Sequence, residues 1–216
     1  MGKKFILGIS GASGVQLAQG FLAHLPKDFS VHIIISRGVI ECAKYELGLN
    51  AKQLESTLQA VREDVRIWSD DDIGAPVASG SFGAKIMAII PTSMDALAKI
   101  ACGISDTLLT RTASVMIKER KTLLLAPREM PLNAIACEHL HKLAMLQVII
   151  APPIIAYYSY PKNLQEMERF LYGKWLDILH IPNTLYTRWG EQGDKHPAKQ
   201  SAPQKSGTKS SKKDKR

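Results

Sequence analysis

Apolar and polar positions along the chain follow two kinds of pattern. Short runs that are apolar at nearly every position are typical of strands buried on both faces of a parallel sheet. Between them lie longer stretches in which apolar residues recur every three or four positions, as in helices that bury one face. The sequence predicts strands at 3–9, 31–35, 65–68, 85–90, 122–126 and 148–151. It predicts helices at 15–25, 38–47, 51–63, 93–101, 107–119, 133–144 and 164–179.

This order of elements favours one fold class. Buried strands separated by helices indicate an α/β fold, with a doubly wound parallel sheet and helices on both of its faces. The length of 216 residues fits one sizeable domain, which we place at residues 1–190. No internal repeat or second domain is evident. No run of 18 apolar residues occurs, so we expect no transmembrane helix.

The last part of the chain, residues 191–216, differs in composition from the rest. It is rich in Lys, Ser, Gln and Pro and has almost no apolar residues, so we expect a disordered basic tail. Eight Lys or Arg against three Asp or Glu give this tail +5 of the total net charge of +8. Nucleic acid is therefore not the expected partner of the domain. Attachment of the tail to RNA or to an acidic protein remains the alternative.

The cysteines and histidines limit the possible chemistry. Cys42, Cys102 and Cys137 are far apart and form no C-x-x-C pair, which indicates a reduced, cytoplasmic setting. His139 and His141 are two positions apart and point to different sides of a helix, and no third ligand is suitably spaced. We therefore predict no metal site. The absence of G-x-S-x-G disfavours an α/β-hydrolase nucleophile.

Ligands of a doubly wound sheet bind beyond the carboxyl ends of the strands, at the point where the strand order reverses. The residues that follow the predicted strands are rich in hydroxyl, guanidinium and aromatic groups, which suit a planar, phosphorylated ligand. They are Ser10–Gly14, Ser36 and Arg37, Pro91–Met94, Pro127–Glu129, and Pro152 and Pro153 with Tyr157, Tyr158 and Tyr160 shortly beyond.

Two of these stretches, and the predicted helix that carries Arg111 and Lys118, contain groups that could bind a ligand. The glycine loop LGISGASGVQ (residues 7–16) lacks the G-x-G-x-x-G spacing and the P-loop lysine. It is either a tight turn without a ligand, or a phosphate site at which Ser13 and the amides of a helix N-terminus bind the anion. Arg111 and Lys118 share one helical face, which is either solvated or functional. In PREMP (residues 127–131), the charged pair Arg128 and Glu129 stands between prolines directly after a buried strand. Charges at such a position are unfavourable for stability unless they have a functional role.

Five motifs occur in a fixed order: GISGASG, ASGSF, LLTRTASVMIKERKTLLLAPREMPL, AYYSYP and RWGE. In their order and spacing they resemble the UbiX-type flavin prenyltransferases, over residues 3 to about 191. The resemblance implies a flavodoxin-like, Rossmann-type sheet that binds FMN. It also implies an activity, in which a dimethylallyl group from dimethylallyl phosphate is joined to N5 and C6 of reduced FMN. The prenylated FMN then passes to a UbiD-type decarboxylase.

The resemblance also implies roles for individual residues. The residues matching the flavin site are Gly11, Ala12, Ser13, Ser36, Thr92, Ser93, Met94, Asp95 and Arg128. Those matching the dimethylallyl phosphate site are Tyr158, Lys174, Arg111, Lys118 and Trp189. Those matching catalytic positions are Glu129, Glu46, Lys118 and Ser13, with Glu129 as the candidate acid for the leaving phosphate. At Gly11 to Gly14 we expect FMN to approach so closely that a larger side chain would block it.

The chain departs from the family pattern at a few positions, and rival functions remain. Thr92 stands where many members have Cys, Ser114 replaces an acid, and Lys174 is often Arg, whose bidentate geometry Lys lacks. The family forms homo-oligomers, often dodecamers, so a neighbouring subunit is expected to complete the phosphate site. One rival is an FMN-dependent cysteine decarboxylase, whose catalytic histidine and Asn-rich loop are not evident. The other is a non-enzymatic flavin carrier or RNA-associated protein.

Overall fold

Six parallel strands form one sheet in the order β3-β2-β1-β4-β5-β6, and the strand order reverses between β1 and β4. The computed structural model describes residues 3–190, so the tail predicted at 191–216 lies outside the described residues. The strands are β1 (Lys3–Ile9), β2 (Phe29–Ile35), β3 (Arg66–Ser69), β4 (Ile86–Thr92), β5 (Thr122–Pro127) and β6 (Ile149–Ile150). This is the doubly wound, Rossmann-type order, which confirms the predicted fold class.

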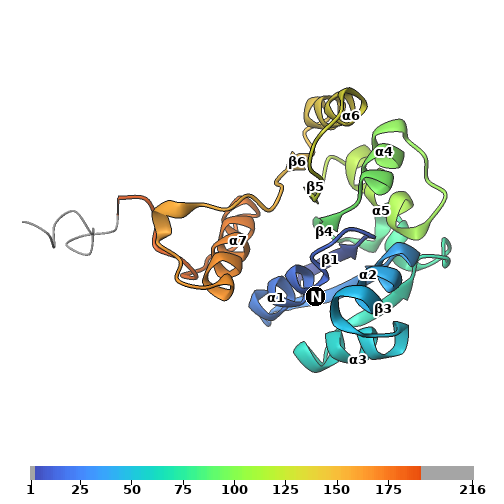
Figure 1. The fold of residues 1–216 in the computed structure, drawn as a ribbon. Coiled ribbons are helices and arrows are strands. Elements are labelled where there is room, and N and C mark those ends of the chain that lie inside the picture. Colours follow the sequence, from blue (N-terminus) through green and yellow to red (C-terminus); the bar gives the residue numbers. More distant parts are fainter. Residues whose placement is uncertain (1–2, 191–216) are drawn as a thin grey trace, which may run out of the picture.

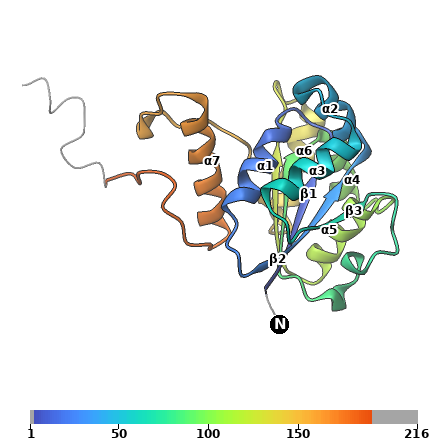
Figure 2. The ribbon, with the colours of Figure 1, turned by 90° about the horizontal axis from the view of Figure 1, so that it is seen from below.

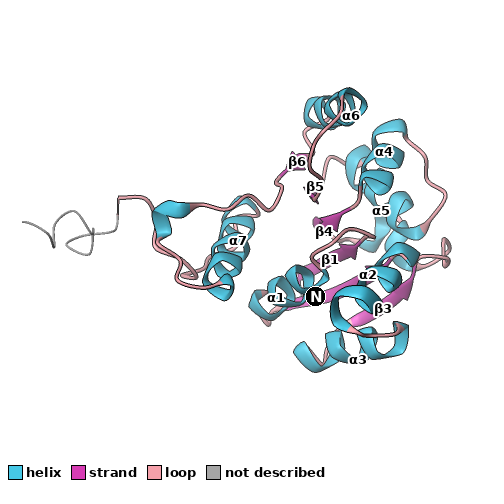
Figure 3. Cartoon of the chain, viewed as in Figure 1, coloured by secondary structure: helices cyan, strands magenta, loops and turns pink. Residues whose placement is uncertain are grey.

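Helices cover both faces of the sheet (Figures 1 and 2). One apolar core lies between the sheet and α1 (Val15–His24), α2 (Arg37–Leu47), α3 (Ala51–Val61) and α7 (Leu164–Ile178). The other lies between the sheet and α4 (Met94–Cys102), α5 (Leu108–Lys118) and α6 (Ala134–Met145). Three short 3₁₀ helices are η1 (Pro76–Ala78), η2 (Gly80–Phe82) and η3 (Tyr157–Ser159). Figure 3 shows the strands as the central layer between these helices.

Each predicted strand and helix occurs, and the differences lie at the boundaries. β4 was expected to end at Ile90, but it continues through Pro91 to Thr92. Pro91 is tolerated inside the strand because the pairing of β4 with β5 shifts register between Ile89 and Thr92. At this irregularity the strand needs no backbone N–H from position 91. This extension brings Thr92 to the carboxyl edge of the sheet.

Helix α7 packs beside α1 at the side of the sheet (Figure 1). The Trp175 side chain is 1% exposed, and its Nε1 donates a hydrogen bond to the carbonyl of Ala151 (2.9 Å). The ring of Tyr172 lies so close to α1 that a Cβ at Gly20 would be 2.1 Å from the Tyr172 hydroxyl oxygen. These contacts fix the position of α7 on the sheet. They thereby place Lys174, which α7 carries, and the start of the segment that follows the helix.

Candidate active site

Hydrogen bonds tie the loops at the carboxyl ends of β1, β2 and β4 to one another. The Ser10 hydroxyl donates to the carbonyl of Pro91 (3.0 Å) and accepts from the backbone N–H of Ser93 (2.7 Å). The backbone N–H of Ser36 donates to the carbonyl of Ile9 (3.0 Å). The predicted flavin loops are therefore brought together at the reversal point between β1 and β4.

Thr92 links this group to β5 through a buried hydroxyl. Its side chain is 0% exposed, donates to the carbonyl of Ile89 (2.7 Å) and accepts from the N–H of Ala126 (3.0 Å). The Thr92 carbonyl accepts from the N–H of Arg128 (3.2 Å). The threonine side chain is thus engaged in the sheet, so a contact from this residue to a ligand would come from the main chain.

Gly11 lies against the first turn of α2. A Cβ on Gly11 would be 2.8 Å from the Cα and carbonyl carbon of Gly38, a distance that real Cβ contacts do not reach. The sequence predicted FMN as the neighbour that requires a glycine here. The structure shows that backbone packing between two loops already requires it, while Ala12 beside it is buried.

A carboxylate occupies the N-terminus of α1, where the sequence indicated a phosphate. The Glu46 carboxylate accepts hydrogen bonds from the N–H groups of Gly14 (3.0 Å) and Val15 (3.2 Å). Gly14 has φ 102°, a left-handed conformation that glycine adopts without strain. The negative charge stabilises the positive end of the helix dipole. Ser13 is exposed beside it, and its hydroxyl makes no hydrogen bond within residues 3–190.

The N-terminus of α2 is open by comparison. Its N-cap residue, Ser36, makes no side-chain capping hydrogen bond, and the Arg37 side chain is turned aside to Asp71 (2.8 Å). The first-turn N–H groups of a helix with no side-chain cap are available to an anion. Among the strand ends that meet here, α2 therefore offers the best position for a phosphate.

The start of α4 supplies the third predicted flavin loop. Ser93 caps this helix by accepting from the N–H of Ala96 (3.2 Å). Asp95 is exposed and pairs with Lys99 (3.4 Å). Met94 lines a cavity of about 280 Å³ together with Glu129 from the loop after β5. This cavity places the candidate acid beside the predicted flavin loop at the start of α4.

Arg128 and Glu129 are exposed and do not pair with each other in the described structure. One Glu129 oxygen accepts only from the adjacent N–H of Met130 (3.0 Å). Burial and the charge of Glu46 raise the pKa of the Cys42 thiol, and the charge of Arg128 opposes them. Arg128 thus lies within electrostatic reach of α2, and both charged groups are available to a ligand.

The predicted substrate residues of the C-terminal part lie together. Tyr158 and Lys174 line a cavity of about 430 Å³ between the end of β6 and α7. The Trp189 ring packs edge-on against Tyr158, with centroids 5.2 Å apart and an interplanar angle of 83°. Most residues that line this cavity are apolar, and Lys174 is the one charged residue among them, which suits a small apolar substrate that carries an anionic group.

Arg111 and Lys118 line neither of these two cavities. Arg111 is exposed in the first turn of α5, and Lys118 is the last residue of that helix. The Lys118 ammonium pairs with Glu119 (2.6 Å), whose side chain lies against Gly80. Because α5 ends just before the amino end of β5, one chain does not bring Lys118 to the glycine loop at the opposite edge of the sheet.

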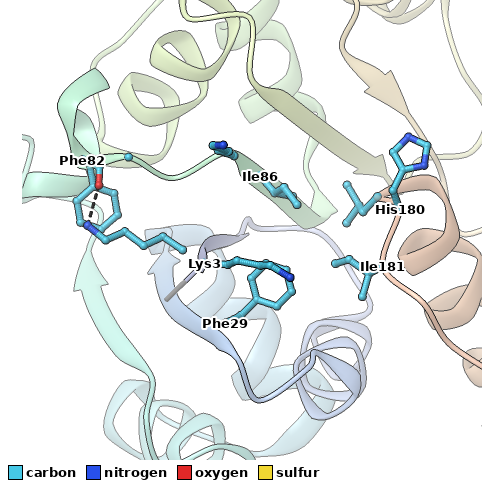
Figure 4. A pocket seen from close by; sticks show the side chains of 10 residues that line it. Lys3, Phe29, Phe82, Ile86, His180 and Ile181 are labelled. Atoms are coloured by element: carbon cyan, nitrogen blue, oxygen red, sulfur yellow. Dashed lines mark hydrogen bonds between the residues drawn. The ribbon is translucent and has the colours of Figure 1, made fainter. Parts of the chain in front are cut away.

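A cavity of about 590 Å³ lies at the amino ends of β1, β2 and β4. Figure 4 shows Lys3, Phe29, Phe82 and His180 around it. Lys3 pairs with Asp28 (3.1 Å), and none of the predicted site residues lines this cavity. It is at the edge of the sheet opposite to the strand ends that bind ligands in doubly wound folds, so it is not the flavin site.

Two properties of residues 3–190 concern metal binding and membranes. No three His, Cys, Asp or Glu side chains in this range are placed to hold a metal ion. None of its helices combines the length and the apolar character needed to cross a membrane.

Comparisons with known proteins agree with this geometry. The profile of the Flavoprotein family matches residues 1–179. The chain is 49% identical to the flavin prenyltransferase UbiX of Helicobacter pylori strain J99 over 87% of this chain and 98% of the relative. It is 44% identical to the same enzyme of Campylobacter jejuni, over 86% and 98%.

Solved structures show the same likeness. AnUbiX (PadA1), in complex with FMN and dimethylallyl pyrophosphate, is 30% identical with a TM-score of 0.81, over 88% of this chain and 98% of that one. A dodecameric FMN-dependent UbiX-like decarboxylase of Escherichia coli O157:H7 is 30% identical with a TM-score of 0.78, over 86% and 98%. The chain belongs to the Flavoprotein family and, within it, to the flavin prenyltransferases of the UbiX type.

Proposed function

We propose that the chain joins the dimethylallyl group of dimethylallyl phosphate to N5 and C6 of reduced FMN. The main observation behind this proposal is that the loops after β1, β2, β4 and β5 meet at one edge of the sheet. Ser36, Arg128 and Glu129 of these loops are therefore available to one ligand. The proposal is supported by the 49% identity to a flavin prenyltransferase and by the likeness to a structure that holds FMN and dimethylallyl pyrophosphate.

The residues at the strand ends fit FMN. The open N-terminus of α2 and the Ser36 hydroxyl would bind its phosphate, next to the point where Gly11 packs on Gly38. Arg128 would contact the flavin, with the α4 start beside it. When bound, reduced FMN supplies the nucleophilic ring positions, while the protein binds, orients and moves protons.

The charged residues suit the departure of an allylic phosphate. Lys174, Arg111 and Lys118 would neutralise the leaving phosphate, so the C–O bond can break without a divalent metal. Glu129 would protonate that phosphate as general acid, and would regain the proton that N5 gives up when its bond forms. The second bond adds one proton to the remaining alkene and releases one from C6, so Glu129 or the phosphate would carry a proton between these positions. Tyr158 and Trp189 would offer aromatic faces to the developing allyl cation.

We further propose that a homo-oligomer completes the site, with Arg111 and Lys118 of a neighbouring subunit meeting the flavin loops. The support is twofold. In one chain Lys118 lies at the end of α5 that is away from the carboxyl edge of the sheet, and large apolar side chains are exposed along the loop before α6, at both ends of α6 and along the segment after β6. They include Met130 (87% exposed), Ile135 (65%), Met145 (73%), Ile154 (69%) and Tyr157 (76%).

Two parts of the proposal concern the cell. The product, prenylated FMN, would pass to a UbiD-type decarboxylase. A cytoplasmic location is supported by the three cysteines, Cys42, Cys102 and Cys137, all of which are free. A direct test of the partner is to add the filtered reaction product to an apo-decarboxylase of this type and measure whether decarboxylation begins.

The reaction itself is tested by the mass of the flavin. The protein is incubated without oxygen with reduced FMN and dimethylallyl phosphate, in the presence of a chelator. We expect the recovered flavin to gain one isoprene unit and inorganic phosphate to be released in equal amount. A parallel sample with dimethylallyl pyrophosphate shows which donor is used. Recovery of unmodified FMN with both donors would overturn the proposed function.

A further inference from the structure

Asp177, in the last turn of α7, accepts hydrogen bonds from three side chains. Its carboxylate is bonded to both terminal nitrogens of Arg188, one of them at 2.9 Å. It also accepts from the hydroxyl of Tyr186 (2.6 Å) and from the amide Nδ2 of Asn183 (2.8 Å). Asp177 is only 21% exposed at its side chain, and Arg188 41%. A paired and multiply bonded carboxylate of this kind fixes geometry more strongly than an exposed ion pair does.

The three donors all belong to the segment 183–188, which has no regular secondary structure. Gly173 lets this segment return onto α7, since a Cβ at Gly173 would lie 2.5 Å from the Tyr186 ring. The Asn183 side chain also donates to the Gly173 carbonyl (3.1 Å). The segment is therefore held to α7 by polar contacts that converge on one carboxylate.

A row of aromatic rings connects this segment to the substrate cavity. Tyr186 packs against Phe170 (centroids 4.9 Å apart), and Phe170 packs against Tyr158 (5.7 Å). Trp189, directly after Arg188, packs edge-on against Tyr158 (5.2 Å). Trp189 itself is 78% exposed, so within residues 3–190 it is held mainly by this ring contact and by its place directly after Arg188.

We propose that Asp177 is a positioning residue for the substrate site: by holding Arg188 and Tyr186, it places Trp189 against Tyr158, which lines the same cavity as Lys174. This inference rests on the proposed function for its effect on turnover, and on the geometry alone for its effect on Trp189. Asp177 touches neither flavin nor substrate in this account and acts only through the segment that it holds.

The effect on turnover is tested with Asp177→Asn, which keeps the shape of the side chain but loses its charge. We expect the KM for dimethylallyl phosphate to rise by roughly tenfold, with kcat and FMN affinity within about threefold of wild type, because one binding contact is misplaced. Asp106→Asn is the matched control. Asp106 lies on the loop before α5 and also forms an ion pair, with Lys99 (3.1 Å), but has no contact with the segment 183–188. That variant should leave all three quantities unchanged.

A double-mutant cycle tests whether Asp177 acts through Trp189. In a Trp189→Ala background, Asp177→Asn should change the KM less than twofold, because the ring that it positions is gone. Equal effects of Asp177→Asn in the presence and absence of Trp189 would overturn the proposal, because they would mean that Asp177 acts on the site by another route.

The geometric part is tested without turnover, by ¹⁹F NMR of protein labelled with 5-fluorotryptophan. Three resonances are expected, for Trp68, Trp175 and Trp189. Tyr158→Leu assigns the Trp189 resonance by removing its ring current. Asp177→Asn should move that same resonance toward the value in denatured protein and leave the other two in place. An unmoved Trp189 resonance would overturn the proposal, even with wild-type prenylation intact. If the Trp189 resonance moves in Asp177→Asn but the wild-type protein does not prenylate FMN, the proposed function alone would be overturned.

Discussion

Gly11 and Gly38 pack backbone to backbone, and this contact joins the loop after β1 to the start of α2. A methyl group on Gly11 would lie 2.8 Å from two backbone atoms of Gly38, which cannot move as a side chain can. The two glycines thus set how closely the proposed phosphate position approaches the glycine loop. A contact within the chain is therefore enough to require a glycine at position 11, in the loop after β1.

Gly11→Ala should therefore destabilise the protein by about 1–3 kcal/mol, the usual range for overpacking a tight contact. It should also weaken FMN binding, because the start of α2 is displaced. Urea denaturation and FMN titration measure the two effects. Gly74→Ala is the control, because a Cβ there meets nothing nearer than 3.8 Å. A Gly11→Ala protein of wild-type stability would show that the contact is easily relieved.

Glu46→Gln tests the carboxylate at the start of α1. The amide still accepts a hydrogen bond from Gly14 or Val15, but the charge that stabilises the helix N-terminus is lost. We expect a loss of about 0.3–1 kcal/mol in the free energy of unfolding, reduced at high salt. Glu41→Gln, on the same helix and exposed, should have no such effect. Equal effects of the two substitutions would contradict the capping role.

Stability at acid pH should depend on Asp177. The hydrogen bonds from Arg188, with those from Tyr186 and Asn183, lower the pKa of Asp177 to about 2, from its ordinary value of 3.8. Because the folded-state pKa is the lower one, this contribution is present above about pH 3.8 and is lost as the pH falls toward 2. The melting temperature of Asp177→Asn should fall less than that of wild type between pH 5 and pH 2. Parallel curves would contradict this.

The sequence was sufficient to predict the sheet and, to within two residues, the carboxyl ends of its strands, because strands buried on both faces read as continuous apolar runs. Given parallel strands, Ser36, Ser93 and Arg128 had to meet at one edge. Contacts between loops were not predictable in this way. Glu46 lies 32 positions from Gly14, and no local pattern indicates that its carboxylate would occupy the helix N-terminus.

Two other features depend on information that a residue pattern does not contain. Asp177 and Arg188 are 11 positions apart and joined by an irregular segment, so their spacing predicts no contact. The sequence correctly predicted that Arg111 and Lys118 lie on one helix, α5. Which site the two residues serve depends on how subunits pack in the proposed oligomer. A pattern within one chain does not determine how copies of that chain pack.

Mixing two inactive variants tests the shared site. Lys118→Ala and Glu129→Gln should each be poorly active. If one subunit supplies Lys118 and its neighbour supplies Glu129, subunits exchanged in a 1:1 mixture should recover activity at roughly a quarter of the sites, by random assembly. Mixing without subunit exchange is the control. No recovery after verified exchange would show that both residues of a site come from one chain.

Single-turnover prenylation by Glu129→Gln tests the central claim most directly. The Gln side chain keeps its shape and its hydrogen bond with the Met130 N–H but cannot donate the acid proton. FMN affinity should barely change, while formation of prenylated flavin, followed by mass, should slow by roughly 10²–10⁴-fold relative to wild type, the usual contribution of a general acid. Near-normal formation of prenylated flavin by Glu129→Gln would contradict the acid assignment, and no prenylated flavin from wild type would contradict the account as a whole.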